Sequence, residues 1–335
     1  LETNPKGSVE TTYDRYGRVT GVTRNGSGGF STTYAYDSFG RIRSELSTSG
    51  AGKLYTYDSL DRIVSVREAV PDGHWVQTGY TYGLYGLLEE TEYSDEEEVI
   101  ARERYIYSYG NLSSVQKDST VTVWSLRAEN DFGQPTEIVT DTLLRQYGYS
   151  VYGLPTYRRI AGGSLQDFEY VFDPLTGNLL RRRDNNHSSS WEEFTYDSLD
   201  RIVSAGGQEV RYAINGNLLG REEDETMTYG SGDHSYQVTG YSATILPFSS
   251  INTQSISYTS YDRPLQITES SIRPSTSKTA TFTYGADGAR VRMVVKDNGW
   301  TTLTRYYIGG RYERDEAVRD TVKRLYLGGD AYSAP

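Results

Sequence analysis

One short passage occurs twice in this chain. The sequence YTYDSLDRIVS stands at residues 55–65, and FTYDSLDRIVS stands at residues 194–204. A catalytic site needs its residues only once, whereas a repeated structural unit needs them at every copy. The duplication therefore predicts a repeat architecture.

Further copies follow the same pattern, an aromatic residue before a D-x-x-G-R turn. Clear copies are YDRYGRV from Tyr13, YDSFGRI from Tyr36, and YDSLDRI from both Tyr57 and Tyr196. Looser copies such as FDPLTGNL from Phe172 bring the count to twelve between Tyr13 and Tyr284, so the mean interval is about 25 residues.

Each copy has the chemistry of a β-hairpin. In YAYDSFGRI the rings of Tyr34 and Tyr36 are two residues apart and share one face of a strand. Asp37 suits the first position of a type I turn, and Gly40 suits the positive φ of a bulge that follows it. If successive hairpins pair edge to edge, we expect the rings to stack in ladders along the sheet.

Composition agrees with strands and excludes several functions. The chain has 31 Tyr and 34 Gly, and its mean hydropathy of −0.63 indicates a thin body with a large wetted surface. A net charge of −11 without a basic patch argues against nucleic acid and against an anionic membrane surface. No apolar run is long enough to span a membrane, and no Cys is present for disulfides or thiolate metal sites.

The predicted fold is therefore all-β, with hairpins stacked into a continuous spiralled sheet that stays open as a partial shell or solenoid. Pairs of hairpins of about 45 residues also fit a six-bladed β-propeller, which is the alternative. We expect a single domain over residues 1–335, with tandem repeats at 13–300. The acidic segment 87–105 is expected to form strands around a loop, and Ser270–Lys278 is expected to be a loop.

The repeats YDSFGRI, YDSLDRI and FDPLTGNL resemble the YD repeats of the bacterial Rhs and insecticidal toxin complex families and of the animal teneurins. The tail at 301–335, with RYYIGGRYERDE and RLYLGGDAYSAP, resembles the segment that precedes the core region of Rhs proteins. The structural residues of the repeat are Tyr13, Asp14, Gly17, Arg18, Tyr36, Asp37, Gly40, Arg41, Tyr57, Asp58, Arg62, Tyr196, Asp197 and Arg201.

The resemblance implies a hollow shell that encloses a variable C-terminal toxin. In that family a core region can release the toxin by aspartyl autoproteolysis, but the one Asp-Pro here, Asp173-Pro174, lies inside a repeat turn. The chain stops at Pro335 before any core motif or toxin domain. We therefore expect a non-enzymatic wall segment without cofactor or metal, part of a larger bacterial protein that is secreted or on the cell surface. Its expected partner is the C-terminal toxin or effector region of the same polypeptide.

The main alternative is an extracellular adhesion module that binds carbohydrate. Trp75 and Trp191 lie outside the repeat marker, and indole rings can stack on sugar rings. A glycoside hydrolase is the least favoured function, since it needs two placed carboxylates whereas the acidic runs here are typical of solvated loops. The three histidines, His74, His187 and His234, lie in loop-like segments and match no catalytic motif.

Overall fold

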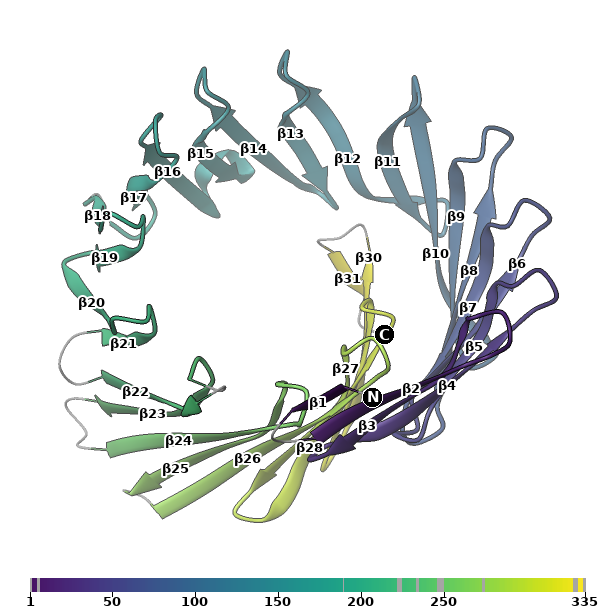
Figure 1. Ribbon diagram of the computed structural model, residues 1–335. Coiled ribbons are helices and arrows are strands. Elements are labelled where there is room, and N and C mark those ends of the chain that lie inside the picture. The colour runs from purple at the N-terminus through teal and green to yellow at the C-terminus, as the bar shows by residue number, and fades with distance from the viewer. Residues whose placement is uncertain are drawn as a thin grey trace. The chain divides into compact units, whose positions relative to one another are not determined.

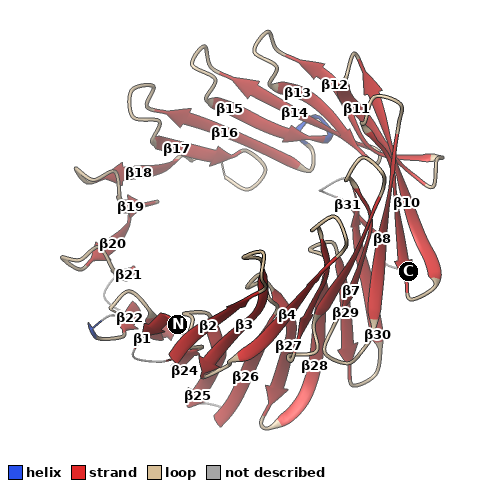
Figure 2. Ribbon diagram, turned by 45° about the vertical axis from the view of Figure 1, so that its right-hand side comes forward, coloured by secondary structure: helices blue, strands red, loops and turns tan. Residues whose placement is uncertain are grey.

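The computed structural model describes residues 2–4, 7–188, 190–221, 225–232, 235–245, 250–272, 275–327 and 331–333. Antiparallel strands make up most of the described chain, as Figure 1 and Figure 2 show. The strands pack into two compact units. The first comprises Leu1–Arg102, Thr228–Leu327 and Tyr332–Pro335, and the second comprises Glu103–Met227 with Gly328–Ala331.

The first unit contains two ladders of strands. The strands of the N-terminal ladder are β1 (Glu2–Asn4), β2 (Gly7–Tyr13), β3 (Val19–Gly26), β4 (Phe30–Tyr36), β5 (Ile42–Ser47), β6 (Gly52–Tyr57), β7 (Ile63–Ala69), β8 (Trp75–Tyr82), β9 (Leu88–Asp95) and the start of β10 (Glu98–Ser108). The strands of the C-terminal ladder are β23 (Val238–Ile245), β24 (Ser250–Tyr258), β25 (Pro264–Ile272), β26 (Ser275–Tyr284), β27 (Arg290–Asp297), β28 (Trp300–Ile308), β29 (Tyr312–Ala317) and β30 (Thr321–Leu327).

The second unit continues along β10. Its further strands are β11 (Asn111–Lys117), β12 (Val121–Glu129), β13 (Pro135–Thr140), β14 (Leu143–Tyr149), β15 (Pro155–Ile160), β16 (Gln166–Phe172), β17 (Leu179–Asp184), β18 (Glu192–Tyr196), β19 (Ile202–Ala205), β20 (Gln208–Tyr212) and β21 (Leu218–Arg221). A short 3-10 helix, η1 (Ala161–Gly163), joins β15 to β16. Strands β22 (Glu225–Tyr229) and β31 (Ala331–Ser333) cross the boundaries between the units.

Within each ladder a strand pairs with the strands before and after it in the sequence. The pairing runs without a break from β1 to β9 in the first unit and from β10 to β21 in the second. A propeller would end a sheet after every fourth strand, so the propeller alternative is wrong and the open stacked-hairpin fold is confirmed.

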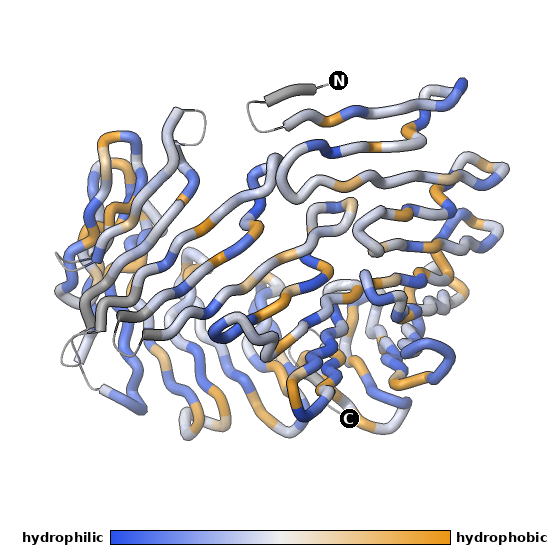
Figure 3. Tube along the Cα trace, turned by 90° about the horizontal axis from the view of Figure 1, so that it is seen from below, coloured by the Kyte–Doolittle hydropathy of each residue, from blue (hydrophilic) through white to orange (hydrophobic). Residues whose placement is uncertain are grey.

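Hydrophobic residues are dispersed along the strands. Figure 3 shows hydrophilic and hydrophobic positions following each other at short intervals. This is the pattern of sheets that expose much of their surface, because side chains alternate between two faces. The large wetted surface expected from the composition agrees with this alternation.

Two sequence expectations have different outcomes. The acidic segment 87–105 forms β9 and the first part of β10 around a loop, as predicted. The expected loop Ser270–Lys278 is wrong, because β25 and β26 extend to Ile272 and from Ser275. A segment rich in Ser and Thr resembles a loop in composition. Here its backbone pairs across β25 and β26, and this pairing makes it a hairpin of two strands.

No helix among the described residues has the length and apolar character needed to cross a lipid bilayer.

Candidate functional site: the repeat latch and the seam

The repeat turn is held by its aspartate. Asp37 Oδ1 accepts hydrogen bonds from the backbone amides of Phe39 and Arg41, at 2.9 and 3.0 Å. The backbone closes the turn from Gly40 N to Asp37 O at 3.1 Å, and Gly40 has φ of 85°. The strand register shifts between Ala35 and Tyr36, so the predicted turn followed by a bulge is confirmed.

Other copies use the same positive-φ position. Gly17 has φ of 78°, whereas Asp61 and Asp200 take the place of glycine with φ of 63° and 57°. Asp is one of the few residues that tolerate this left-handed conformation, so the turn survives the exchange.

The repeat arginine connects one hairpin to the next. Arg41 Nε donates to Asp37 Oδ2 at 2.7 Å, and its guanidinium lies 4.5 Å from the ring centroid of Tyr57 in the following hairpin. The arrangement recurs at Arg18 over Tyr36, Arg62 over Tyr82 and Arg201 over Tyr212. Its acid partners there are Asp14, Asp58 and Asp197.

The marker tyrosine completes the connection through its hydroxyl. Tyr57 OH donates to the backbone carbonyl of Ile42 in the preceding hairpin at 2.7 Å. The same bond recurs from Tyr36, Tyr82, Tyr149, Tyr196, Tyr258 and Tyr284 to the carbonyls of Val19, Ile63, Pro135, Leu179, Val238 and Pro264. We call the Asp, the Arg and the next Tyr the repeat latch. Tyr13 does not show this pattern and is 61 % exposed.

The expected ladder of stacked rings is wrong at three marker tyrosines. A guanidinium, and not a second ring, covers Tyr36, Tyr57 and Tyr82. Ring pairs among the described residues occur elsewhere, for example between Phe168 and Tyr170 at 6.1 Å. Arginine is favoured over a second ring at this place because one guanidinium can bind the turn carboxylate and the ring face at once.

Aspartate at the bulge adds an ion pair between hairpins. Asp61 Oδ1 lies 2.6 Å from Arg41 Nη1 of the preceding turn. Asp200 accepts in the same way from Asn178 at 2.8 Å, and Asp262 accepts from Gln237. An aspartate at this position thus adds a side-chain bond to the preceding repeat while the backbone keeps its positive φ.

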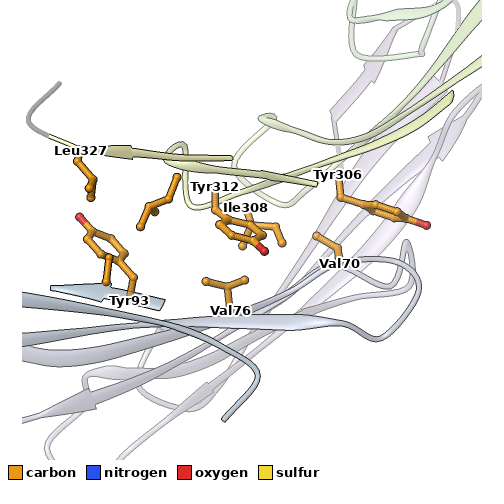
Figure 4. Packing of buried hydrophobic residues seen from close by; sticks show 9 residues of the cluster. Val70, Val76, Tyr93, Tyr306, Ile308, Tyr312 and Leu327 are labelled. Carbon is orange, nitrogen blue, oxygen red and sulfur yellow. The ribbon is translucent and has the colours of Figure 1, made fainter. Parts of the chain in front are cut away.

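A seam joins the two ladders of the first unit. Its apolar part places Val70, Val76, Tyr93 and Ala101 of the N-terminal ladder against β28, β29 and β30. Figure 4 shows Tyr93 and Val76 pointing toward Tyr312, Ile308 and Leu327. The residues contributed by the C-terminal ladder are Tyr306, Ile308, Tyr312, Leu325 and Leu327, all at most 6 % exposed.

A buried carboxylate lies at one end of the seam. Asp95 Oδ2 accepts hydrogen bonds from Tyr312 OH at 2.7 Å and from Lys323 Nζ at 2.6 Å. His74 Nε2 lies 2.5 Å from Asp95 Oδ1 without the alignment of a hydrogen bond, and its Nδ1 faces Glu96. Burial alone would raise the pKa of Asp95, but hydrogen bonds from Lys323 and Tyr312 and the nearby charges of His74 and Lys323 lower it.

The same contact affects the phenol. Burial, together with its bond to the Asp95 carboxylate, raises the pKa of Tyr312 far above its ordinary value. The phenol therefore keeps its proton and remains a hydrogen-bond donor. Sequence reasoning named His74 only as a loop-like residue and did not place it at a buried carboxylate. It missed the meeting of Asp95 with Tyr312 and Lys323, because nothing in the local sequence marks residues that meet across more than 200 positions.

The two tryptophans proposed for sugar binding have cations on their rings. The guanidinium of Arg67 lies 3.3 Å from the ring centroid of Trp75. Those of Arg181 and Arg183 lie 4.6 and 4.7 Å from the ring of Trp191. A sugar that stacked on either indole would compete with these cations, so glycan binding at both residues stays a prediction.

A groove of about 650 Å³ opens beside Trp191 in the second unit. Phe168, Arg182 and Glu192 line it, and Arg182 Nε donates to Glu192 Oε2 at 2.5 Å. Arg182 and Glu192 thus already satisfy each other. Among the described residues, no set of three or more His, Asp or Glu side chains is placed to hold a metal ion. The candidate His234 lies outside the described residues.

Comparison with known proteins identifies relatives of the fold alone. No protein-family model and no curated protein sequence matches this chain. A chain in the structure titled Crystal Structure of TcdB2-TccC3 is similar with a TM-score of 0.60 and 14 % identity, over 99 % of this chain and 22 % of that one. A chain of TcdB2-TccC3-TEV is similar with a TM-score of 0.50 and 13 % identity, over 95 % of this chain and 21 % of that one. The protein thus has the fold of a region that makes up about a fifth of those longer chains.

Proposed function

We propose that this chain is a non-enzymatic wall segment of an Rhs and YD-repeat shell. The shell would enclose a C-terminal toxin or effector region of the same polypeptide and help to deliver it. The source would be a larger bacterial protein, secreted or on the cell surface. The repeat latch is the observation that carries the proposal. Its repeated residues form bonds between successive hairpins, as the wall of a shell requires.

Two further features support a wall. Successive strands of each ladder are paired by backbone hydrogen bonds without interruption, as a continuous wall requires. The seam packs the C-terminal ladder of the first unit against its N-terminal ladder, so two sheets cover part of each other. The similarity to TcdB2-TccC3 chains is a similarity of fold and agrees with this reading.

Enclosure is tested by protection from proteolysis. We would append a disordered, protease-labile peptide after Pro335 and compare its cleavage rate with that of the same peptide on an unrelated folded domain. A wall that shields the peptide slows its cleavage on this chain. The variant Leu325→Ala, which weakens the seam, should lose part of the protection, and equal cleavage rates on both carriers would contradict enclosure.

Carbohydrate binding is the second candidate, and the groove beside Trp191 is the observation that favours it. The test is a glycan array with the intact chain and with Trp75→Ala and Trp191→Ala. A signal that the Trp191→Ala variant alone loses would support this function. Silence across the array, or a signal that both variants keep, would remove it.

A further inference from the structure

Hairpin ends of the first unit meet in a regular order along the seam. In an antiparallel meander the connections alternate between two rims, here called the tip rim, with the D-x-x-G turns, and the back rim. Three successive tips of the C-terminal ladder contact the N-terminal ladder at three successive places along its back rim. The tip between β24 and β25 meets the β3–β4 loop, the next tip meets the start of β6, and the third packs on the β7–β8 loop.

The contacts along this order are specific. Ser260 N donates to Ser27 O at 2.9 Å, and Lys53 Nζ donates to Asp287 Oδ2 at 3.0 Å. Ile308 and Val70 belong to one buried cluster. Each of these hairpins of the C-terminal ladder therefore contacts one hairpin of the N-terminal ladder, and the contacts follow the same sequence order in both ladders.

Tyr261 shows how a tip residue is received. Its ring meets Phe30 edge to face at 5.8 Å, and its hydroxyl donates to Gly28 O at 3.1 Å. The Thr259 side chain lies so close to Gly28 that a Cβ on this glycine would be 2.6 Å from Thr259 Cγ2. A glycine-rich loop followed by an aromatic residue is thus the receiving element.

The N-terminal ladder presents four tips of the same kind without such a cover. Tyr16, Phe39, Leu60 and Tyr85 occupy the position of Tyr261 in their turns and are 66 to 88 % exposed. Each is apolar or aromatic although it faces solvent, and a row of exposed apolar residues marks an interaction surface.

The back rim of the C-terminal ladder carries a loop of the same kind as the receiving element, a glycine followed by an aromatic residue. Its β27–β28 loop places Gly299 before Trp300, as the β3–β4 loop places Gly29 before Phe30. Phe30 is 8 % exposed under Tyr261, whereas Trp300 is 81 % exposed. In the next back connection Val318 is also largely exposed.

We infer that the exposed tips of one copy of this chain dock on the Trp300 and Val318 loops of a second copy. The contact continues the seam, with one tip at Trp300 and the following tip at Val318. Tip rim and back rim are different surfaces, so the association is head to tail and can extend beyond a dimer.

Sedimentation velocity over a concentration series tests this association. The intact chain is expected to shift to larger species as its concentration rises. The double variants Phe39→Glu/Leu60→Glu, on the tips, and Trp300→Glu/Val318→Glu, on the back rim, are each expected to suppress the shift. Leu54→Glu is the matched control, since Leu54 is an exposed residue within strand β6 and belongs to neither set of proposed docking residues.

Mixing the two double variants makes the test directional. Each keeps one intact rim, so an equal mixture is expected to form a dimer that does not extend. Circular dichroism checks that both variants fold. A chain that stays monomeric at every concentration, assembly that persists in the back-rim variant, or a mixture that forms no dimer would each overturn the inference.

Discussion

The aspartate of the turn carries charge as well as shape. Burial alone would raise the pKa of Asp37, but the hydrogen bonds from the Arg41 side chain and from the amides of Arg41 and Phe39 outweigh burial and lower it. The pKa of Asp14, Asp58 and Asp197 is lowered by equivalent bonds. A carboxylate with a lowered pKa stabilises the folded state above the unfolded pKa, and that stability is lost as the pH falls through the folded value.

We therefore expect the chain to lose stability on acidification below about pH 4, where aspartates of the unfolded chain take up protons. The measurement is the urea midpoint from pH 7 to pH 3. Asp58→Asn should lower the midpoint at pH 7 and make its acid dependence shallower. Asp131→Asn, in an exposed turn position, serves as the control, and an unchanged slope in Asp58→Asn would contradict the role of the turn.

The bulge position offers a gain of stability. A Cβ on Gly40 would lie 3.4 Å from Arg18 Nη1, which matches the pairing of Asp61 with Arg41. We expect Gly40→Asp to be more stable than Gly40→Asn at low salt, since both tolerate a positive φ but only Asp forms the ion pair. The difference should vanish at high salt because the pair is exposed to screening.

Gly73 provides the matched pair of controls. It also has a positive φ, of 90°, but no atom lies within 4 Å of its added Cβ. Asp and Asn at this position should therefore be equally stable. Thermal unfolding of the four variants decides the matter, and a Gly40 pair that behaves like the Gly73 pair would refute the ion pair.

At the scale of the hairpin, the latch replaces a core. Tyr57 contributes its ring to Arg41 and its hydroxyl to a backbone carbonyl, and neither contact requires deep burial. A single hairpin is marginally stable alone, so bonds between hairpins decide whether the wall holds. Each latch contributes a modest amount of free energy, and the number of latches makes their sum large enough to hold the hairpins together.

Tyr57→Phe should cost about 0.5–1.5 kcal/mol of unfolding free energy, the usual net value of one hydrogen bond. Tyr36→Phe and Tyr82→Phe should cost similar amounts and add, since the three sites share no partner. Tyr16→Phe is the control, because this exposed hydroxyl contacts only the neighbouring Arg15. Urea unfolding measures all four variants, and a loss in Tyr16→Phe equal to that in Tyr57→Phe would show that the carbonyl bond does not matter.

Over the whole chain, the buried apolar clusters of the described residues lie in the first unit. Both join the N-terminal to the C-terminal ladder, one around Tyr93 and Leu325 and one around Phe30 and Phe282. Tertiary packing of segments distant in sequence thus adds to the local latches. We expect the seam to set the stability of the first unit.

Leu325→Ala should cost about 2–5 kcal/mol, the usual range for emptying a buried leucine site. Leu180→Ala, at a partly exposed position of β17, should stay within about 0.5 kcal/mol. The measurement is urea unfolding followed by tryptophan fluorescence. Equal costs for both variants would show that the seam does not stabilise the first unit.

The sequence predicts the parts of this fold that are local. The D-x-x-G-R turn, the bulge at Gly40 and the strands flanking the acidic segment 87–105 all follow from residues within one hairpin. The latch was missed in part, because the ring under Arg41 belongs to the next hairpin and its position depends on strand pairing. The seam could not be predicted, since Asp95 and Tyr312 meet at a separation of 217 residues and neither lies in a repeat motif.

The latch ends on a backbone carbonyl, and this has a consequence for evolution. Every residue supplies a carbonyl, so the receiving position can mutate freely while the tyrosine still finds its acceptor. Only a few side chains per hairpin are then constrained by the latch, and the other residues can be substituted. Few identical residues are then needed for one fold, which is consistent with a TM-score of 0.60 at 14 % identity.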